Sequence, residues 1–189
     1  MSIVPAFEIG VWNAWILMIW LLVPFFLEPL NIIPKSREEG SNLAAELNKI
    51  QKSAFLSFHI IFLLMVIYSI FLPLKLGTIW FNSGLTIYLL GLILYVMVFV
   101  GFATTSPDKP VTKGIYRYSR HPMYVTSFVL FIGMGIASAS WLFLLLSFLF
   151  IILVYFSVVS EERFCLKYYG NSYREYMEKT PRWIGIPKS

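Results

Sequence analysis

The chain has little charge, one cysteine and two histidines, and these scarcities exclude several classes of protein. Only 13% of its 189 residues are charged, and 58% are hydrophobic. About a quarter of the residues of a soluble domain are charged, so this composition excludes an ordinary soluble protein as well as intrinsic disorder. The single Cys165 excludes a disulfide framework and a cysteine-built zinc or iron–sulfur site. Because two histidines leave little for another kind of metal centre, we expect no metal.

Long uncharged segments take up most of the chain. Runs without Asp, Glu, Lys or Arg lie at 9–27, 53–74, 76–107 and 121–160. A helix of about 20 apolar residues crosses a bilayer, so the last run is long enough for a helical hairpin, with its turn in the small-residue cluster 133–140. The first run lacks a basic start and a cleavage site, and is interpreted as a retained span. We expect one all-α integral membrane domain over 1–189 with five transmembrane helices, at about 9–27, 53–73, 84–103, 122–137 and 141–160.

The basic residues predict the orientation of these spans. Four, four and six of the 15 Lys and Arg residues lie in segments 28–52, 104–120 and 161–189, and only Lys75 lies on the other side. The positive-inside rule therefore places these three segments in the cytoplasm and the N-terminus outside the cell membrane. The net charge of +5 then indicates contact with anionic membrane lipids rather than with nucleic acid.

The polar segments that follow the third and fifth spans differ in pattern. Segment 104–120 contains two prolines and Gly114, which argue against a plain helix. In the tail, Leu166, Tyr169, Tyr173 and Tyr176 recur at three or four residues, which predicts a cytosolic amphipathic helix that Gly170 weakens or breaks. This helix is either a surface helix or a lid on a site at the membrane edge.

Two motifs flank the predicted hairpin. Residues 114–124 read Gly-Ile-Tyr-Arg-Tyr-Ser-Arg-His-Pro-Met-Tyr, and residues 161–176 read Glu-Glu-x-x-x-Leu-x-Tyr-Tyr-Gly-x-x-Tyr-x-x-Tyr, with Pro181-Arg182 a few residues later. In residue type, order and spacing this pair resembles the isoprenylcysteine carboxyl methyltransferase family and the related phospholipid methyltransferases. The resemblance covers about residues 84–185, and the size of the chain is similar to that of a minimal prokaryotic member.

The resemblance implies a membrane-embedded methyltransferase that uses S-adenosylmethionine and releases S-adenosylhomocysteine. It implies a cofactor region at the cytosolic edge, formed by 104–124 and 161–185. The expected cofactor-binding residues are Asp108, Lys109, Pro110, Val111, Tyr116, His121, Pro122, Met123 and Tyr124. Glu162 is the expected catalytic carboxylate on the acceptor side. Eukaryotic members have a substrate-binding arginine one helical turn earlier, where this chain has Val158.

The residues themselves fit this chemistry. Proline is tolerated in the first turn of a helix, so Pro122 can open the fourth span, and His121 then lies where unpaired amide donors collect. A neutral imidazole there can hydrogen-bond a carboxylate or a ribose. The faces of Tyr116 and Tyr124 can lie near a cationic sulfonium.

The methyl acceptor stays open between two chemistries. An ionised carboxylate needs only alignment and loss of water, and Arg163 can pair with it as a second catalytic residue. An amine must first lose a proton, which Glu161 or Glu162 can accept. We therefore expect a lipidic, prenylated carboxylate acceptor, with a phospholipid N-methyltransferase as the alternative. An NADPH-dependent sterol-type reductase and a non-catalytic membrane protein are the remaining interpretations. An apolar acceptor chain is expected to enter sideways between helices, at the third and fourth spans.

Overall fold

Helices that run along one common direction make up most of the structure, a computed structural model that describes residues 8–27 and 49–188. The helices are α1 (Trp15–Leu27), α3 (Lys49–Ile70), α4 (Ile79–Ala103), the 3-10 helix η2 (Gly114–Arg117), α5 (Pro122–Ala137), α6 (Trp141–Tyr169) and α7 (Asn171–Lys179). Most of segment 28–52, predicted to be cytoplasmic, lies outside the described residues. Within the described ranges the only β-type pairing is an isolated bridge between Asn13 and Pro73. The predicted all-α fold is therefore confirmed.

In the part of the chain that the structure describes, two helices have the length and apolarity needed to cross a membrane. They are α4, with 25 residues, and α6, with 29 residues. Each begins at a hydroxyl cap: Thr78 Oγ1 accepts a hydrogen bond from the Phe81 amide, and Ser140 Oγ accepts one from the Phe143 amide. The apolar parts of α3 and α5 are shorter, at Leu56–Ile70 and Pro122–Ala137. The structure thus supports a helical membrane protein.

The first apolar run forms a shorter helix than expected, because part of it pairs with another segment. Residues 8–14 precede α1, and the Asn13 amide group donates to the carbonyls of Glu8 (2.6 Å) and Ile70 (2.7 Å). The Ala14 amide donates to the Leu72 carbonyl at 2.8 Å. These bonds join the start of α1 to the chain that leaves α3, and hydropathy alone does not reveal them.

The predicted hairpin is present, and its first helix packs closely on α4. Residues 138–140 form the turn between α5 and α6, within the small-residue cluster expected to hold it. A Cβ on Gly84 would lie 2.2 Å from the Ala137 nitrogen, and one on Gly133 would lie 2.7 Å from the Tyr88 nitrogen. The backbones of α4 and α5 are therefore in contact. This contact argues against the expected passage of an acceptor chain between these two helices.

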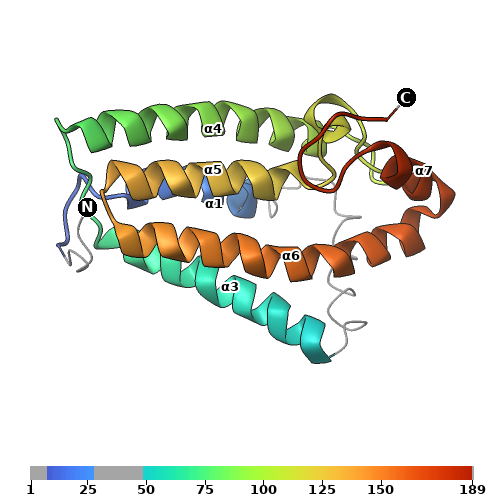
Figure 1. Ribbon diagram of the computed structural model, residues 1–189, viewed down its shortest axis with the longest axis horizontal. Coiled ribbons are helices and arrows are strands. Elements are labelled where there is room, and N and C mark those ends of the chain that lie inside the picture. The colour runs from blue at the N-terminus through green and yellow to red at the C-terminus, as the bar shows by residue number, and fades with distance from the viewer. Residues whose placement is uncertain (1–7, 28–48, 189) are drawn as a thin grey trace.

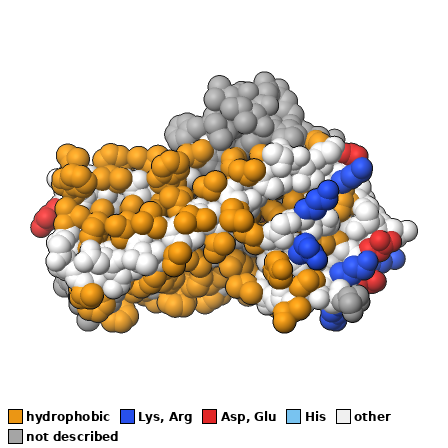
Figure 2. All heavy atoms as spheres, turned by 90° about the horizontal axis from the view of Figure 1, so that it is seen from above, with side chains coloured by type: hydrophobic (Ala, Val, Ile, Leu, Met, Phe, Trp, Pro, Cys, Tyr) orange, Lys and Arg blue, Asp and Glu red, His pale blue; other side chains and the backbone are white. Residues whose placement is uncertain are grey.

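Charge and apolar surface are separated along the bundle. Figure 2 shows hydrophobic side chains over most of the length and Lys and Arg side chains gathered at one end. Exposed apolar residues lie on the outer faces of α3, α4 and α6, among them Leu63, Ile93 and Leu145. The core between the helices is filled by fully buried Phe131 and Phe143, among others. The structure thus has an apolar belt and one polar end, and the polar end holds both sequence motifs.

The predicted C-terminal amphipathic helix is divided in two. Gly170 has a φ of +57°, a left-handed conformation that glycine adopts without strain. As a result Leu166 and Tyr169 belong to α6, whereas Tyr173 and Tyr176 are buried residues of α7. Because α6 continues through 161–169, the two glutamates that follow the uncharged run lie inside a helix, not at its C-terminus. Figure 1 shows α7 turning back toward the loop between α4 and α5.

Candidate functional site

The first motif is held against the bundle by α7. Tyr116, in η2, is buried together with Val98 and Val111, and Met123 packs on this cluster. The Tyr176 hydroxyl donates to the carbonyl of Tyr116 at 2.7 Å. The buried backbone carbonyls of an irregular loop need hydrogen-bond donors from elsewhere, because an unpaired buried carbonyl costs free energy. The two motifs are therefore joined directly through backbone and side chain.

Residues 180–188, which we call the C-terminal strap, return along the same loop. The Arg120 amide donates to the Pro181 carbonyl and the Gly185 amide donates to the Tyr118 carbonyl, each at 3.0 Å. The Lys188 amide donates to the Lys179 carbonyl at 2.8 Å. Figure 1 shows this segment beside the loop at the polar end of the bundle. The strap thus covers the Arg-His-Pro part of the first motif.

A buried carboxylate connects the loop, α6 and the strap. Glu162 is 3% exposed, and its Oε1 lies 3.0 Å from Arg120 Nη2 and 3.3 Å from His121 Nε2. Arg182 makes a bidentate pair with it, Nη2 to Oε2 at 2.6 Å and Nε to Oε1 at 3.1 Å. Burial alone would raise the pKa of the Glu162 carboxyl, but the hydrogen bonds from His121 and Arg182 and the charges of both arginines outweigh burial and lower it to about 2.

The neighbouring glutamate has a different environment. Glu161 has a side chain that is 35% exposed, and its Oε2 lies 3.4 Å from His121 Nδ1. The Tyr124 hydroxyl donates to its Oε1 at 2.6 Å. Among the described residues no lysine or arginine pairs with this carboxylate. Glu161 is therefore the less neutralised of the two carboxylates, and it faces His121 from the other side.

His121 lies between the two carboxylates. Burial would lower the pKa of its imidazole, but the hydrogen bonds and charges of Glu161 and Glu162 outweigh burial and raise the pKa above its ordinary value. When both ring nitrogens donate, the imidazole carries a proton on each. The structure thus favours the imidazolium form, where the sequence suggested a neutral ring, because the sequence did not reveal that both glutamates point at it.

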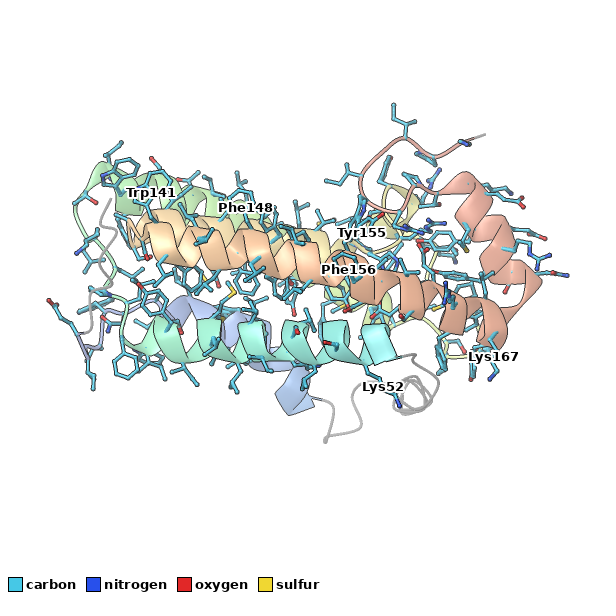
Figure 3. The ribbon with its side chains drawn as sticks, turned by 60° about the horizontal axis from the view of Figure 1, so that its bottom comes forward. Lys52, Trp141, Phe148, Tyr155, Phe156 and Lys167 are labelled. Carbon is cyan, nitrogen blue, oxygen red and sulfur yellow. The ribbon has the colours of Figure 1, made fainter. Side chains whose placement is uncertain are left out.

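Aromatic rings surround this histidine. The Tyr124 ring stacks on His121 with 6.2 Å between centroids, and the Trp183 ring of the strap lies 6.3 Å from it. Trp183 in turn stacks on Tyr155 of α6 at 6.3 Å. Figure 3 shows Tyr155 and Phe156 on α6, toward the end of the bundle that also carries Lys167. A row of aromatic faces thus leads from the outer surface of α6 to His121.

The structure brings some of the predicted residues together and leaves others apart. His121, Tyr124 and Glu162 meet in one cluster, and Pro122 opens α5 beside them. Val111, Tyr116 and Met123 form the adjoining apolar cluster. Pro110 is half-buried, whereas Lys109 and Asp108 are exposed; the Asp108 carboxylate accepts a hydrogen bond from the Ser106 hydroxyl. Arg163 is exposed and makes no ion pair within the described part of the chain.

Three residues of the site were not among those predicted from the sequence. Arg120, Arg182 and Trp183 contact Glu162 or His121. The signal was present, because Arg120 belongs to the Arg-His-Pro box and Arg182 closes the second motif. Their partner could not be inferred, since ion pairing between residues 20 and 42 positions apart depends on the fold. In residues 8–27 and 49–188 no group of three or more His, Cys, Asp or Glu side chains could hold a metal ion.

Comparison with known proteins gives the family. The sequence model of the phospholipid methyltransferase family matches residues 74–172, a little more than half of the chain. Protein-S-isoprenylcysteine O-methyltransferase of Schizosaccharomyces pombe is 37% identical over 79 residues, which cover 41% of this chain and 32% of the relative. The enzyme of the same name from Dictyostelium discoideum is 32% identical over 90 residues, with the same two shares. The aligned part of the chain thus spans about a third of the length of each relative. No solved structure gives a significant match.

Fold and site together define a helical membrane protein with a buried ionic cluster at the polar end of its bundle. The matched segment contains the first motif, the hairpin and the first part of the second motif, residues 161–172. The chain belongs to the phospholipid methyltransferase family, and the predicted resemblance is confirmed.

Proposed function

We propose that this protein is an integral membrane methyltransferase that transfers a methyl group from S-adenosylmethionine to a lipidic acceptor. The observation that carries the proposal is the meeting of the two motifs: His121 Nε2 lies 3.3 Å from Glu162 Oε1 although 41 positions separate the residues. The family and the names of its relatives support methyl transfer. Side chains of each motif are held in place by contacts with the other motif. A binding site formed by both motifs requires such contacts.

The groups present at the site fit this cofactor. Its sulfonium is a cation, which aromatic faces such as those of Tyr124 and Trp183 attract. Its carboxylate needs a donor, and Arg120 Nε is buried without a hydrogen-bond partner among the described residues. When bound, the cofactor supplies a methyl group on a positively charged sulfur.

The loop and the first turn of α5 would hold the cofactor. We assign this role to Val111, through its backbone, and to Tyr116, His121, Pro122, Met123 and Tyr124, with Asp108, Lys109 and Pro110 at the margin. Tyr116 and Val111 are buried in one apolar cluster, which suits an adenine ring. Asp108 and Lys109 are exposed, so their contribution is smaller. The strap, through Trp183, excludes water from the side facing the cytosol.

A lipidic carboxylate is the first candidate acceptor, because the two relatives are named isoprenylcysteine O-methyltransferases. Such an acceptor is already ionised and needs alignment and loss of water rather than a base. It also needs a cation. Arg120 and Arg182 are already paired with Glu162, so the exposed Arg163 or the unpartnered Nε of Arg120 would have to supply it. This candidate therefore uses Glu162 only indirectly.

An amine headgroup is the second candidate, and the environment of Glu161 favours it. The carboxylate is partly exposed, is oriented by the Tyr124 hydroxyl and pairs with no lysine or arginine of the described chain. An ammonium group can therefore give its proton to Glu161. Its nitrogen then forms a bond to the methyl carbon while the carbon–sulfur bond breaks and its electron pair stays on sulfur. The negative charge that assists an amine would repel a carboxylate.

We further propose the membrane placement inferred from charge: five spans, with the N-terminus outside and the site at the cytoplasmic face of the cell membrane. Exposed Trp80 and Trp141 mark the end that carries Lys75, as expected of a membrane interface. From Trp141 to Glu161 the α6 axis rises about 30 Å, which is the thickness of a hydrocarbon core. Glu161 would then lie at the headgroup level, where a lipid headgroup can reach it.

Because α4 packs closely on α5, the acceptor chain needs a route other than the one between these two helices. We propose that it reaches the site over Tyr155, which is exposed on α6 and stacks on Trp183. Replacing Tyr155 with alanine would raise the KM for a long-chain acceptor more than that for a short-chain analogue. Equal KM changes for both acceptors would remove this route.

Methyl transfer in nanodiscs tests the function. The full chain is incubated with methyl-labelled S-adenosylmethionine and, separately, a prenylcysteine analogue, an amine phospholipid and total lipid, and NADPH consumption is measured in parallel. Labelled lipid is expected, without NADPH turnover. NADPH turnover would select the reductase, and neither reaction would favour a non-catalytic protein. Glu161→Gln separates the acceptors: it should abolish transfer to the amine and spare transfer to the carboxylate.

A further inference from the structure

Within residues 8–27 and 49–188, one side-chain ion pair, between Arg182 and Glu162, joins the strap to the bundle. Arg182 reaches Glu162 of α6 through both ends of its guanidinium, at 2.6 and 3.1 Å. Bidentate arginine–carboxylate pairs are short, directional and stronger than neutral hydrogen bonds. The remaining polar contacts of the strap involve its backbone, as in the bonds of Gly185 and Lys188. This pair is therefore the charged side-chain contact that ties the strap to α6.

The same carboxylate also positions the first motif. Glu162 Oε1 accepts from Arg120 and lies 3.3 Å from His121 Nε2. With four contacts on its two oxygens, this buried group has little capacity left for a ligand. Any shift of the carboxylate that follows loss of Arg182 changes both the location and the charge environment of His121. Arg182 is thus coupled to His121 through the carboxylate of Glu162, which contacts both side chains.

The Arg182 side chain is 32% exposed, whereas that of Glu162 is 4% exposed. We call this ion pair the latch, and the exposure of Arg182 makes the latch accessible from the water side. Trp183 is the next residue of the strap, and its ring lies 6.3 Å from the His121 imidazole. An opening of the latch would therefore also be expected to move Trp183 away from His121.

We propose that Arg182 is a positioning residue, which holds the C-terminal strap closed and fixes His121 through Glu162. The part of this proposal that concerns binding of S-adenosylmethionine and S-adenosylhomocysteine rests on the proposed function. The proposal predicts that loss of Arg182 both loosens the strap and speeds the release of S-adenosylhomocysteine. Lysine keeps the charge but cannot form the bidentate fork, so it should restore the function only in part.

The experiment uses the full chain in nanodiscs with Arg182→Gln, Arg182→Lys and, as control, Arg174→Gln. Arg174 is exposed on α7, so its replacement removes the same charge without touching the latch. The measurements are hydrogen exchange of the Gly185 and Lys188 amides, the pKa of His121 by NMR and the affinity for S-adenosylhomocysteine. Breaking a charged pair of this kind should change exchange and affinity by about tenfold or more in Arg182→Gln.

The pKa of His121 should also rise in Arg182→Gln, because Glu162 then loses one of the cations that offset its charge. Arg182→Lys should lie between wild type and Arg182→Gln in all three measurements, and Arg174→Gln should match wild type. Wild-type exchange and an unchanged His121 pKa in Arg182→Gln would overturn the proposal, as would equal effects in Arg174→Gln. A further outcome is that neither wild type nor any variant binds S-adenosylhomocysteine, while hydrogen exchange of the strap amides still increases in Arg182→Gln. That outcome would refute the proposed function and support the role of Arg182 in holding the strap.

Discussion

Replacing Glu162 with glutamine tests the ionic cluster with the smallest change in shape. The substitution keeps the size of the side chain but removes the charge that faces Arg120, His121 and Arg182. The pKa of the carboxyl is lowered from 4.5 to about 2, and this difference corresponds to about 3 kcal/mol in favour of the folded state at neutral pH. Breaking a buried ion pair by removing one partner costs about 3–5 kcal/mol. Because Arg182 is partly exposed, we expect the lower end, about 3 kcal/mol.

The stability that Glu162 contributes depends on pH, and the direction of this dependence follows from its lowered pKa. A carboxyl whose pKa is lowered by folding stabilises the protein above its unfolded pKa, and the stabilisation is lost as pH falls through the folded pKa. For Glu162 this window runs from about pH 5 down to about pH 2. The stability difference between wild type and Glu162→Gln should therefore shrink to about half of its neutral value near pH 3.

Reversible unfolding in mixed micelles, followed by tryptophan fluorescence at pH 7 and pH 3, measures both quantities. Glu175→Gln is the matched control, because Glu175 is exposed on α7 and undergoes the same chemical change. It should leave the free energy of unfolding within about 0.5 kcal/mol of wild type. A Glu162→Gln protein as stable as wild type at pH 7, or a loss that is the same at both pH values, would refute the reasoning.

Further predictions concern the packing and the loop. Gly84→Ala should destabilise the bundle by about 2 kcal/mol or more, because its Cβ would lie 2.2 Å from the Ala137 nitrogen. Gly101→Ala, in the same helix with nothing within 4 Å of the added carbon, should be neutral or stabilising by up to about 1 kcal/mol; equal melting temperatures for these two variants would contradict the packing. Tyr176→Phe should cost about 1 kcal/mol of stability by removing the 2.7 Å bond to the Tyr116 carbonyl, and should weaken S-adenosylhomocysteine binding measured by calorimetry. Unchanged binding would show that α7 does not order the loop.

The sequence was informative about the helices for a simple physical reason. Uncharged runs of known length restrict where helices can lie, and the small residues near 138–140 predicted the hairpin turn that separates α5 from α6. Gly170 was correctly expected to weaken the last helix, and it divides α6 from α7 through its left-handed backbone. The first run was less informative, because the pairing of Asn13 with Pro73 shortens α1. Such pairing between distant segments has no periodicity that a sequence can show.

The site was predicted as a set of residues but not as an arrangement. The motifs named His121, Tyr124 and Glu162, and the structure brings them together. The sequence could not show that two adjacent glutamates face opposite sides of one imidazole, because that depends on how α6 is rotated against α5. It also could not show that Arg182 returns to Glu162. The resemblance implied that Glu162 serves the acceptor, and the structure adds its contacts with Arg120, His121 and Arg182.

Titration calorimetry with S-adenosylhomocysteine is the most direct measurement of the central claim, that the two motifs form one donor site. The full chain in nanodiscs should bind one molecule per chain. Both His121→Ala, in the first motif, and Glu162→Ala, in the second, should weaken binding by about tenfold or more, since each removes part of the same cluster. Arg174→Gln should bind as wild type does. Absence of binding, or binding that is unaffected by either motif substitution, would contradict the account.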